Sequence, residues 1–435
     1  MTITGHAHTP ARVSALNIGL PHAVLTQRSW VWIRRGIMAT AFLVAAQGVS
    51  TPALDTIGTG GWASGVSLER AGARLWLSPV TSILEQLALL PARCHIAIIA
   101  SVVFAAFVFG AMRDLRMATW RSSLTQAVSW SVRALAIVIA VYLLGALVPW
   151  PMAALRHPAD EVAVDFHSHT DRSHDGRWSF SAARNAEWHR SGGFDVAYLT
   201  DHADSAAAST VDLGSVRSPI LLPGAEFSSA GAHVVRLGLA RERSSALVLT
   251  APFPPSAATR LRLAGTTISA VEAIDASPRG LQWSRDHPDA ARAASAQLSA
   301  PLIAASNQHG WGRTAVAWTL LRLPGWHQNT AAELDERIRS LIRAGDTSRI
   351  RVIRRRGTEP LPALGSEAWV VPLFLVTVLR TLDQREVVVW LMWIWVPILG
   401  LLSRDLVVWR RGRLARSGEQ DTPATRSVPS DREAA

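Results

Sequence analysis

Long apolar runs lie toward both ends of the 435-residue chain, whereas the middle of the chain alternates between apolar and polar positions. Before residue 157 the uncharged runs are Gly36–Val49, Cys94–Met112 and Ala134–Leu155. The second and third are long enough to cross a bilayer as helices. The first is short, and a buried helix of a soluble core is its alternative interpretation. The pattern predicts about three membrane spans within residues 31–157.

The apolar character returns after Pro362. Trp369–Leu379 is followed by the polar turn DQRE and then by Val387–Leu402. Val387–Leu402 predicts a span within residues 363–418, and Trp369–Leu379 is either a second span or a helix at the membrane interface. Residues 1–30 form a polar tail, and we expect residues 419–435 to be disordered.

Composition supports a membrane protein. Charged residues make up 18% of the chain and apolar residues 49%, and 44 Lys+Arg exceed 33 Asp+Glu to give a net charge of +11. Such a charge often indicates nucleic-acid binding, but here much of the arginine flanks apolar runs, so we expect a membrane and no nucleic acid. The single cysteine, Cys94, excludes an intrachain disulfide and a cysteine-rich zinc site.

The arginines also predict an orientation. The N-terminal tail and the loop after Met112 carry an excess of arginine, and the loop between the first two runs is balanced. The positive-inside rule therefore places the tail and the loop after Met112 in the cytoplasm. Residues after Leu155 are then outside, which predicts a multi-pass protein of a bacterial-type cell membrane with an extracytoplasmic soluble domain.

Residues 158–362 are patterned as a soluble α/β domain. The helix Thr330–Ala344 is signalled by Thr330, Glu333 and the following Gly345. Alternating strands and helices predict a barrel or a doubly wound sheet, in which chemistry gathers at the C-terminal ends of the strands. The predicted strands are Val162–Phe166, Val196–Leu199, Ile220–Leu222, His233–Leu239, Ala246–Leu249, Ala270–Ile274 and Leu302–Ala305.

Polar residues with metal-binding side chains follow several of these strands. His167 and His169 are two residues apart in extended chain and therefore face the same way. The other strand ends and turns supply the motifs SHDG, TDH, GAE with a later His233, and SNQHG. A single histidine is usually structural, but this repetition indicates a multinuclear site. Imidazole and carboxylate ligands without thiolate suit Zn²⁺, Mn²⁺ or Fe²⁺.

The motifs DFHSHT, SHDG, LTDH and PGAEF followed by HVV resemble, in order and spacing, the PHP (polymerase and histidinol phosphatase) superfamily. The resemblance covers Val162 to His309, about a third of the chain. It implies a distorted (β/α)7 barrel, inserted here between transmembrane helices. It also implies two or three divalent metal ions and phosphoesterase activity.

The resemblance also implies roles for individual residues. His167 and His169 would hold one metal ion, and Glu226 would bridge it to another ion that His233 serves. Asp175, His202 and His309 would hold a further ion, with His202 and His309 also steadying charge in the reaction. Asn307 takes the place of an aspartate that would bind the first ion.

Three departures from the family pattern affect the expected number of metal ions and the identity of their ligands. Asn307 offers an amide oxygen without negative charge, which predicts a weaker ligand. A histidine expected before the strand AVEAID is absent, which favours two metal ions over three, and His287 after that strand is a substitute candidate. His174 competes with Asp175 as a ligand, because SHDG is one residue longer than the usual motif.

Two arginine-containing segments are further candidates for binding an anionic group. Arg313, in the glycine-rich segment HGWGRT, is either a phosphate-binding side chain or a surface residue of a turn. The segment from Arg349 to Arg356 predicts an edge strand with a solvated basic face, and contact with anionic lipid is the alternative.

The first function hypothesis is a membrane-anchored, metal-dependent phosphoesterase acting on a phosphorylated small-molecule or lipid-linked substrate, with His202, His309 and Arg313 as catalytic residues. The second is a non-catalytic receptor that binds a metal and a phosphorylated or acidic ligand. A nuclease or proofreading role is the least compatible with the membrane segments.

Overall fold

The computed structural model describes residues 26–48, 53–57, 63–70, 72–114, 120–147, 152–202, 219–239, 245–312, 314–357 and 369–420. Arg313, most of the N-terminal tail and residues 421–435 lie outside these ranges. The chain divides into two compact units, one of residues 1–45 with 390–435 and one of residues 46–389.

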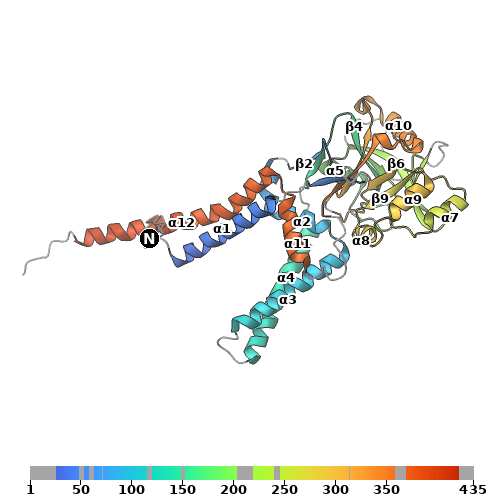
Figure 1. Ribbon diagram of the computed structural model, residues 1–435. Helices are drawn as coiled ribbons and strands as arrows, with labels where there is room; N and C mark the ends of the chain where they lie inside the picture. Colours follow the sequence, from blue (N-terminus) through green and yellow to red (C-terminus); the bar gives the residue numbers. More distant parts are fainter. Residues whose placement is uncertain are drawn as a thin grey trace, which may run out of the picture. The chain divides into compact units, whose positions relative to one another are not determined.

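The first unit pairs helix α1 (Gln27–Gln47) with most of α12 (Gln384–Gln420) (Figure 1). Near the start of α1 the hydroxyl of Ser29 donates a hydrogen bond to Asp405 at 2.5 Å. Farther along, the Trp395 indole donates to the Thr40 hydroxyl at 3.0 Å. A Cβ at Gly36 would lie 2.5 Å from the side chain of Ile398, so glycine permits this close helix packing.

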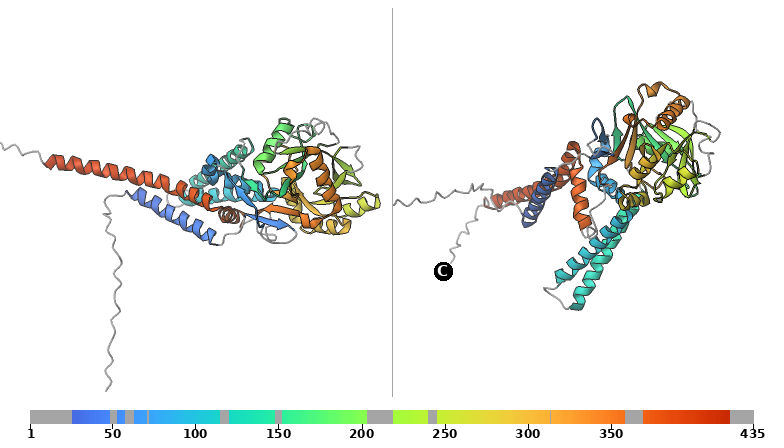
Figure 2. Two further views of the ribbon diagram at one scale, coloured as in Figure 1. Left: turned by 90° about the horizontal axis from the view of Figure 1, so that it is seen from above. Right: turned by 45° about the vertical axis from the view of Figure 1, so that its right-hand side comes forward.

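Among the described residues, three helices are long and apolar enough to cross a membrane: α3 (Ala92–Asp114), α4 (Trp120–Leu147) and α12. Helix α11 (Val370–Arg380) is a shorter apolar helix. Helix α1, which contains most of the first apolar run, is not one of the three. Helices α3 and α4 lie side by side (Figure 1 and the right-hand view of Figure 2). These helices are compatible with the membrane protein that the sequence predicts.

The second unit is built on one ten-stranded sheet with mixed strand directions. The runs β4-β5-β6 and β8-β9-β10 are parallel, and all other neighbours are antiparallel. In sheet order the strands are β1 (Leu54–Ile57), β12 (Ile350–Arg355), β11 (Ala317–Arg322), β4 (Glu161–Ser168), β5 (Val196–Leu199), β6 (Ile220–Ser229), β7 (Ala232–Leu237), β8 (Ala246–Leu249), β9 (Ala270–Asp275) and β10 (Leu302–Ala305). A small ribbon pairs β2 (Ser67–Glu69) with β3 (Ala154–Arg156).

The ten-stranded sheet is strongly curled, as Figure 2 shows. The curl returns β10 to the middle of the sheet, where the Ala304 amide donates a hydrogen bond to the Thr319 hydroxyl of β11 at 2.8 Å. Just beyond β10, the carbonyl of Gln308 accepts from the amide of His169 at 2.8 Å. The α/β class predicted from the sequence is confirmed, and the finer assignment to a (β/α)7 barrel stays a prediction.

Helices connect and cover the strands of this unit. Helix α10 (Ala331–Ala344) begins at the predicted cap, since the Thr330 hydroxyl accepts from the Glu333 amide while the Glu333 carboxylate accepts from the Thr330 amide. It ends at Gly345 in the left-handed conformation that favours glycine. The remaining helices are α2 (Ser78–Ala88), α5 (Ala182–Gly192), α7 (Ala257–Leu263), α8 (Pro278–Asp286), α9 (Ala290–Leu298) and α10 (Ala331–Ala344), with 3₁₀ turns Gly72–Leu77, Trp326–Gln328 and Thr347–Arg349.

Strand β1 comes from the segment between the first and second apolar runs, which the sequence assigned to the membrane region. It pairs antiparallel with β12, placing Leu54 opposite Arg355. Strand β12 therefore has neighbours on both sides, β1 and β11, and is not the edge strand that the alternation predicted. Arg354 binds Asp55, so at this position the basic face is paired with a carboxylate instead of open to solvent.

A buried ion cluster fixes the start of α12 and helix α2 to this sheet. Arg70 contacts Glu85 of α2 and Glu386 of α12, each at 2.5 Å. Arg355 of β12 binds the same Glu85 carboxylate at 2.5 Å. Because breaking one partner of a buried pair leaves an uncompensated charge, the four side chains act as a single structural element.

Candidate metal centre

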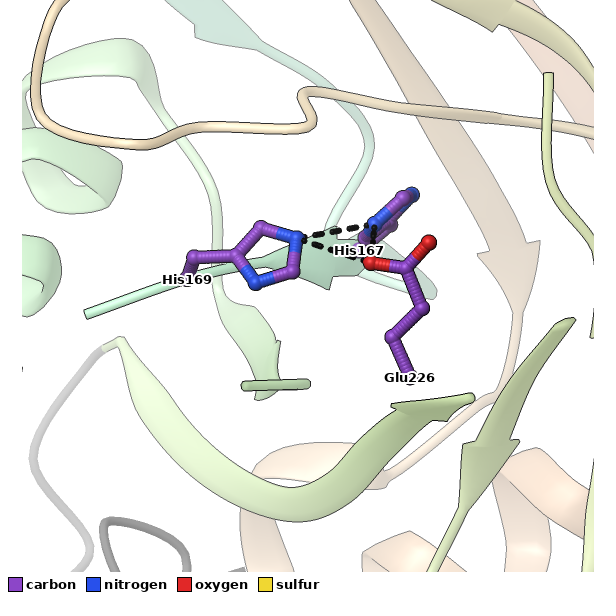
Figure 3. Close-up of side chains that lie close together, drawn as sticks. All are labelled: His167, His169 and Glu226. Carbon is purple, nitrogen blue, oxygen red and sulfur yellow. Dashed lines mark hydrogen bonds and ion pairs between the residues drawn. The ribbon is translucent and has the colours of Figure 1, made fainter. Parts of the chain in front are cut away.

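The centre begins at the C-terminal end of β4, a strand buried on both faces. His167 is its penultimate residue and His169 follows it, and both imidazoles are almost completely buried. Their Nε2 atoms lie 3.0 Å apart, as the alternation of side chains in an extended segment predicts (Figure 3). Two imidazole nitrogens are therefore directed at one point.

Glu226 of the parallel strand β6 is a third candidate ligand at the same point. Its Oε2 atom lies 3.2 Å from Nε2 of His167 and 3.3 Å from Nε2 of His169 (Figure 3). The ligand atoms of one tetrahedral ion, with bonds of about 2.0–2.1 Å, lie about 3.3–3.4 Å apart. The observed spacings are close to these values, so the three side chains fit one ion.

Glu226 also contacts two further histidines. His202, three residues after the end of β5, places Nδ1 3.3 Å from Oε2, the oxygen that also faces His167 and His169. His233, on the antiparallel strand β7, places Nδ1 2.7 Å from Oε1. One carboxylate is thus in contact with four imidazoles, three through Oε2 and one through Oε1.

A third part of the centre comes from the turn after β4 and the loop after β10. Asp175 lies 3.3 Å from Nε2 of His202 through one oxygen and 3.3 Å from Nδ1 of His309 through the other. The ring of His309 stacks on that of His169 with centroids 4.1 Å apart. His174 lies beside Asp175 and His202 and is close enough to act with them.

Among the described residues, four groups of His, Asp and Glu side chains have ligand atoms close enough to hold a metal ion. Seven of the eight metal ligands proposed from the sequence belong to them, together with His174. The groups are His167, His169 and Glu226; His169, Asp175 and His309; His174, Asp175 and His202; and His202, Glu226 and His233.

Three sequence candidates are placed differently. His287 is exposed, its Nδ1 contacts the carbonyl of Trp283, and it belongs to none of these groups. Arg313 lies outside the described residues. The side chain of Asn307 is engaged at both ends, by the carboxylate of Asp275 at 3.1 Å and by Nε2 of His309 at 2.8 Å.

Two buried acids of β9 near the centre were missed by the sequence reasoning. Glu272 lies 3.4 Å from Nδ1 of His167, on the side of the ring away from Glu226. Asp275 accepts from Asn307 and from the amide of Ser277 at 2.7 Å. The signal was present in AVEAID, since a carboxylate within an apolar buried strand requires a partner.

Two further acids fix the loops that carry the ligands. Asp165 of β4 contacts the buried His189 at 2.7 Å and accepts from the Ser306 amide at 2.9 Å. Asp201, next to His202, accepts from the amide and hydroxyl of Thr170 at 2.6 and 2.8 Å. These contacts tie the segments after β4, β5 and β10 to one another.

The buried histidines of the centre differ in the direction in which their pKa values are shifted. Burial lowers the pKa of His169 to about 4 and that of His309 to about 3, so both rings are neutral at physiological pH. Burial opposes the protonation of His167 as well, but Glu226 and Glu272 raise its pKa well above the ordinary value. Burial would raise the pKa of Glu226, yet His167 and His169 lower it far below the usual range. Burial raises the pKa of Glu272 to about 7.

The donor set fits divalent metal ions. Nδ1 of His309 and Oε1 of Glu272 are buried and make no hydrogen bond to any described residue. Nδ1 of His309 lies within one of the metal-binding groups, and a buried nitrogen in that position lacks a partner that an ion would supply. Imidazole and carboxylate donors match Zn²⁺, Mn²⁺ and Fe²⁺.

No family model and no curated protein matches the chain. Among solved structures, the chain is similar to PsfC from Pseudomonas syringae PB-5123, at 17% sequence identity and a TM-score of 0.29. The matched region covers 50% of this chain and 97% of PsfC.

Proposed function

We propose that the protein is a membrane-anchored phosphoesterase that uses two or three divalent metal ions. The observation that carries the proposal is Glu226, a buried carboxylate in contact with four imidazoles. Bound divalent ions supply Lewis acidity toward a phosphoryl oxygen and lower the pKa of a coordinated water. The resemblance of the ligand motifs to the PHP superfamily supports the same reaction class.

The burial of the ligands gives the centre a closed end and an open end. His167 and His169 are 2% and 0% exposed, whereas the side chains of Asp175 and His233 are 43% and 55% exposed. Structural metal sites are closed, while catalytic sites keep a position open to water and substrate. This gradient favours substrate approach from the side of Asp175 and His233, where His202 and His309 can stabilise developing charge.

A cavity of about 270 Å³ lies beside the loops that carry Asp175 and His309, lined by Arg177, Arg184, Phe180, Trp188, Met152 and Gly310. The Arg177 guanidinium lies over the Trp311 ring at 5.3 Å. Among the described residues, Arg177 and Arg184 have no carboxylate partner, and Glu187 of the cavity pairs with Arg190. Basic and apolar walls together fit an anionic group attached to an apolar body, which is the chemistry of a lipid-linked phosphate.

The side chain of Asn307 favours one alternative, a receptor that binds metal and a phosphorylated ligand without turnover. An amide in place of a carboxylate brings no negative charge to the centre. The two functions make different predictions for purified protein, because only the enzyme releases inorganic phosphate.

The experiment uses the full chain purified in detergent and supplied with Mn²⁺ or Zn²⁺. We expect bound metal by elemental analysis and hydrolysis of 4-nitrophenyl phosphate or of a panel of phosphate monoesters. The double variant His167→Ala with His169→Ala should lose at least one ion per chain and all turnover. His327→Ala, an exposed histidine of a 3₁₀ turn, is the matched control. Unchanged metal content in the double variant contradicts the site, and metal binding without turnover favours the receptor.

A further inference from the structure

Asn307 lies between a buried carboxylate and a candidate metal ligand. Its Nδ2 atom donates to Asp275 Oδ2 at 3.1 Å, and its Oδ1 atom faces Nε2 of His309 at 2.8 Å. Asp275 is fully buried and is not a member of any of the four metal-binding groups found among the described residues. The amide therefore links Asp275 to His309 through two hydrogen bonds.

The direction of these bonds fixes the proton on His309. Because a carboxylate oxygen accepts, the amide must present its NH₂ group to Asp275, and its oxygen then faces the imidazole. An amide oxygen can only accept, so Nε2 of His309 carries the proton. The lone pair is left on Nδ1, which lies 3.3 Å from Asp175 and makes no hydrogen bond within the described part of the chain.

The residues around Asp275 fix the position of its carboxylate, which is the end of this hydrogen-bonded series farthest from His309. The Ser277 amide donates to its other oxygen at 2.7 Å. A Cβ at Gly280 of α8 would overlap the Asp275 carboxyl carbon, so only glycine allows the helix to pack against the carboxylate. The carboxylate is thereby fixed on the side facing Asn307.

We infer that Asp275 and Asn307 are positioning residues that hold His309 as an Nδ1 metal ligand, and that Asn307 is not itself a ligand. Metal-bound histidines commonly donate their second N–H to a fixed acceptor, which sets the tautomer and the ring orientation. Here the acceptor is an amide whose orientation is set by a carboxylate one hydrogen bond farther away. The inference rests on the metal centre of the proposed function, but not on hydrolysis.

The backbone conformation of Asn307 makes it a suitable position for a substitution by aspartate. Asn307 has a φ of 44°, in the left-handed region that Asn and Asp tolerate better than other residues with a Cβ. Asn307→Asp therefore changes charge and hydrogen bonding with little change in backbone preference. The new carboxylate cannot donate to Asp275, and two carboxylates this close cannot both ionise freely.

The experiment measures the Zn²⁺ affinity of the full chain in detergent by competition with a chelator. Asn307→Asp should weaken binding about 10–100-fold, the usual cost of losing an outer partner of a metal ligand. The exchange variant, Asp275→Asn with Asn307→Asp, should recover most of the loss. In that variant the amide at position 275 donates to the carboxylate at position 307, which in turn accepts from His309. Asn329→Asp, at a residue bonded to Arg337, is the matched control and should bind as the parent does.

Tighter Zn²⁺ binding by Asn307→Asp would show that position 307 is a ligand and overturn the inference, as would an exchange variant no better than the single one. If Asn307→Asp does not fold, Asp275→Asn is measured in its place. This variant should bind Zn²⁺ more weakly than the parent chain, and an unchanged Zn²⁺ affinity would also overturn the inference. A parent chain that binds no Zn²⁺ refutes both the inference and the proposed function. A parent chain that binds Zn²⁺ without hydrolysing phosphate esters refutes only the phosphoesterase.

Discussion

Glu272 places a carboxylate oxygen 3.4 Å from Nδ1 of His167, while Glu226 contacts Nε2 of the same ring at 3.2 Å. The imidazole is therefore held between two carboxylates from β9 and β6. Glu272 also accepts from the Ala251 amide at 3.2 Å, which fixes its own orientation. This is how an outer carboxylate orients a histidine toward a metal ion.

We expect Glu272→Ala to weaken metal binding about 10–100-fold, because His167 loses the partner that orients its ring. Glu272→Gln keeps a carbonyl oxygen that accepts from Nδ1 and should lose less. Chelator competition measures both variants. If the two bind Zn²⁺ equally well, or as well as the parent chain, Glu272 has no part in orienting His167.

Acid should destabilise the metal-free protein through His169. Its folded pKa is about 4 because the ring is buried, whereas the unfolded chain keeps the ordinary value of 6.5. Between these values the unfolded state binds the proton more tightly, so stability is lost as the pH falls from 6.5 to 4. From pH 7 to pH 5 this group costs about 2 kcal/mol.

Thermal unfolding of the chelator-treated chain at pH 7 and pH 5 tests this effect. His169→Asn has no titrating ring, so its unfolding temperature should fall less between the two pH values than that of the parent. Identical decreases would show that His169 is already protonated in the folded state or exposed to solvent.

Membrane topology can be tested independently of chemistry. The arginine pattern predicts that the soluble domain is extracytoplasmic, so a reporter active only outside the cytoplasm should be active when fused after Pro158 and inactive when fused after Arg121. Strand β1 adds a third position: because it pairs with β12, residues before α3 share the compartment of the domain. A fusion after Leu90 should therefore be active, and the opposite result at all three positions would place the domain in the cytoplasm.

The cavity beside the centre should bind diphosphates through its arginines. Calorimetry in EDTA, where no turnover occurs, compares farnesyl diphosphate with inorganic pyrophosphate. Arg177→Ala with Arg184→Ala should weaken the binding of farnesyl diphosphate about tenfold or more, since each charge-assisted hydrogen bond contributes well over 1 kcal/mol. Arg322→Ala, at an exposed arginine that pairs with Asp160 away from the cavity, is the control.

The two ligands distinguish the source of the anion. Tighter binding of farnesyl diphosphate supports a lipid-linked substrate against Phe180 and Trp188, and equal binding supports a soluble one. A double variant that binds both ligands as the parent does would exclude the cavity as the anion site.

The sequence predicted the elements whose signals are local. Strands β5, β8 and β10 have the predicted bounds, and α10 has the predicted cap. Strand β1 was missed, because its four residues become a strand only beside β12, and Arg354 and Asp55 are 299 residues apart.

In the metal centre, too, the sequence predicted the features that depend on local spacing and missed those that depend on distant segments. Histidines two residues apart in a strand predict convergence, and His167 with His169 show it. The contact of Asn307 with Asp275 spans 32 residues and depends on the register of β10 beside β9, which no local spacing encodes. Sequence spacing could therefore identify candidate ligands but not the side chains that orient them.

The pairing of β1 with β12 also sets an order for biogenesis. Leu54–Ile57 is synthesised before the α3–α4 pair, and Ile350–Arg355 long after it. During translation β1 therefore stays unpaired until nearly the whole domain has been made. A chain truncated before residue 350 leaves this strand without its partner and is a natural substrate for proteolytic quality control.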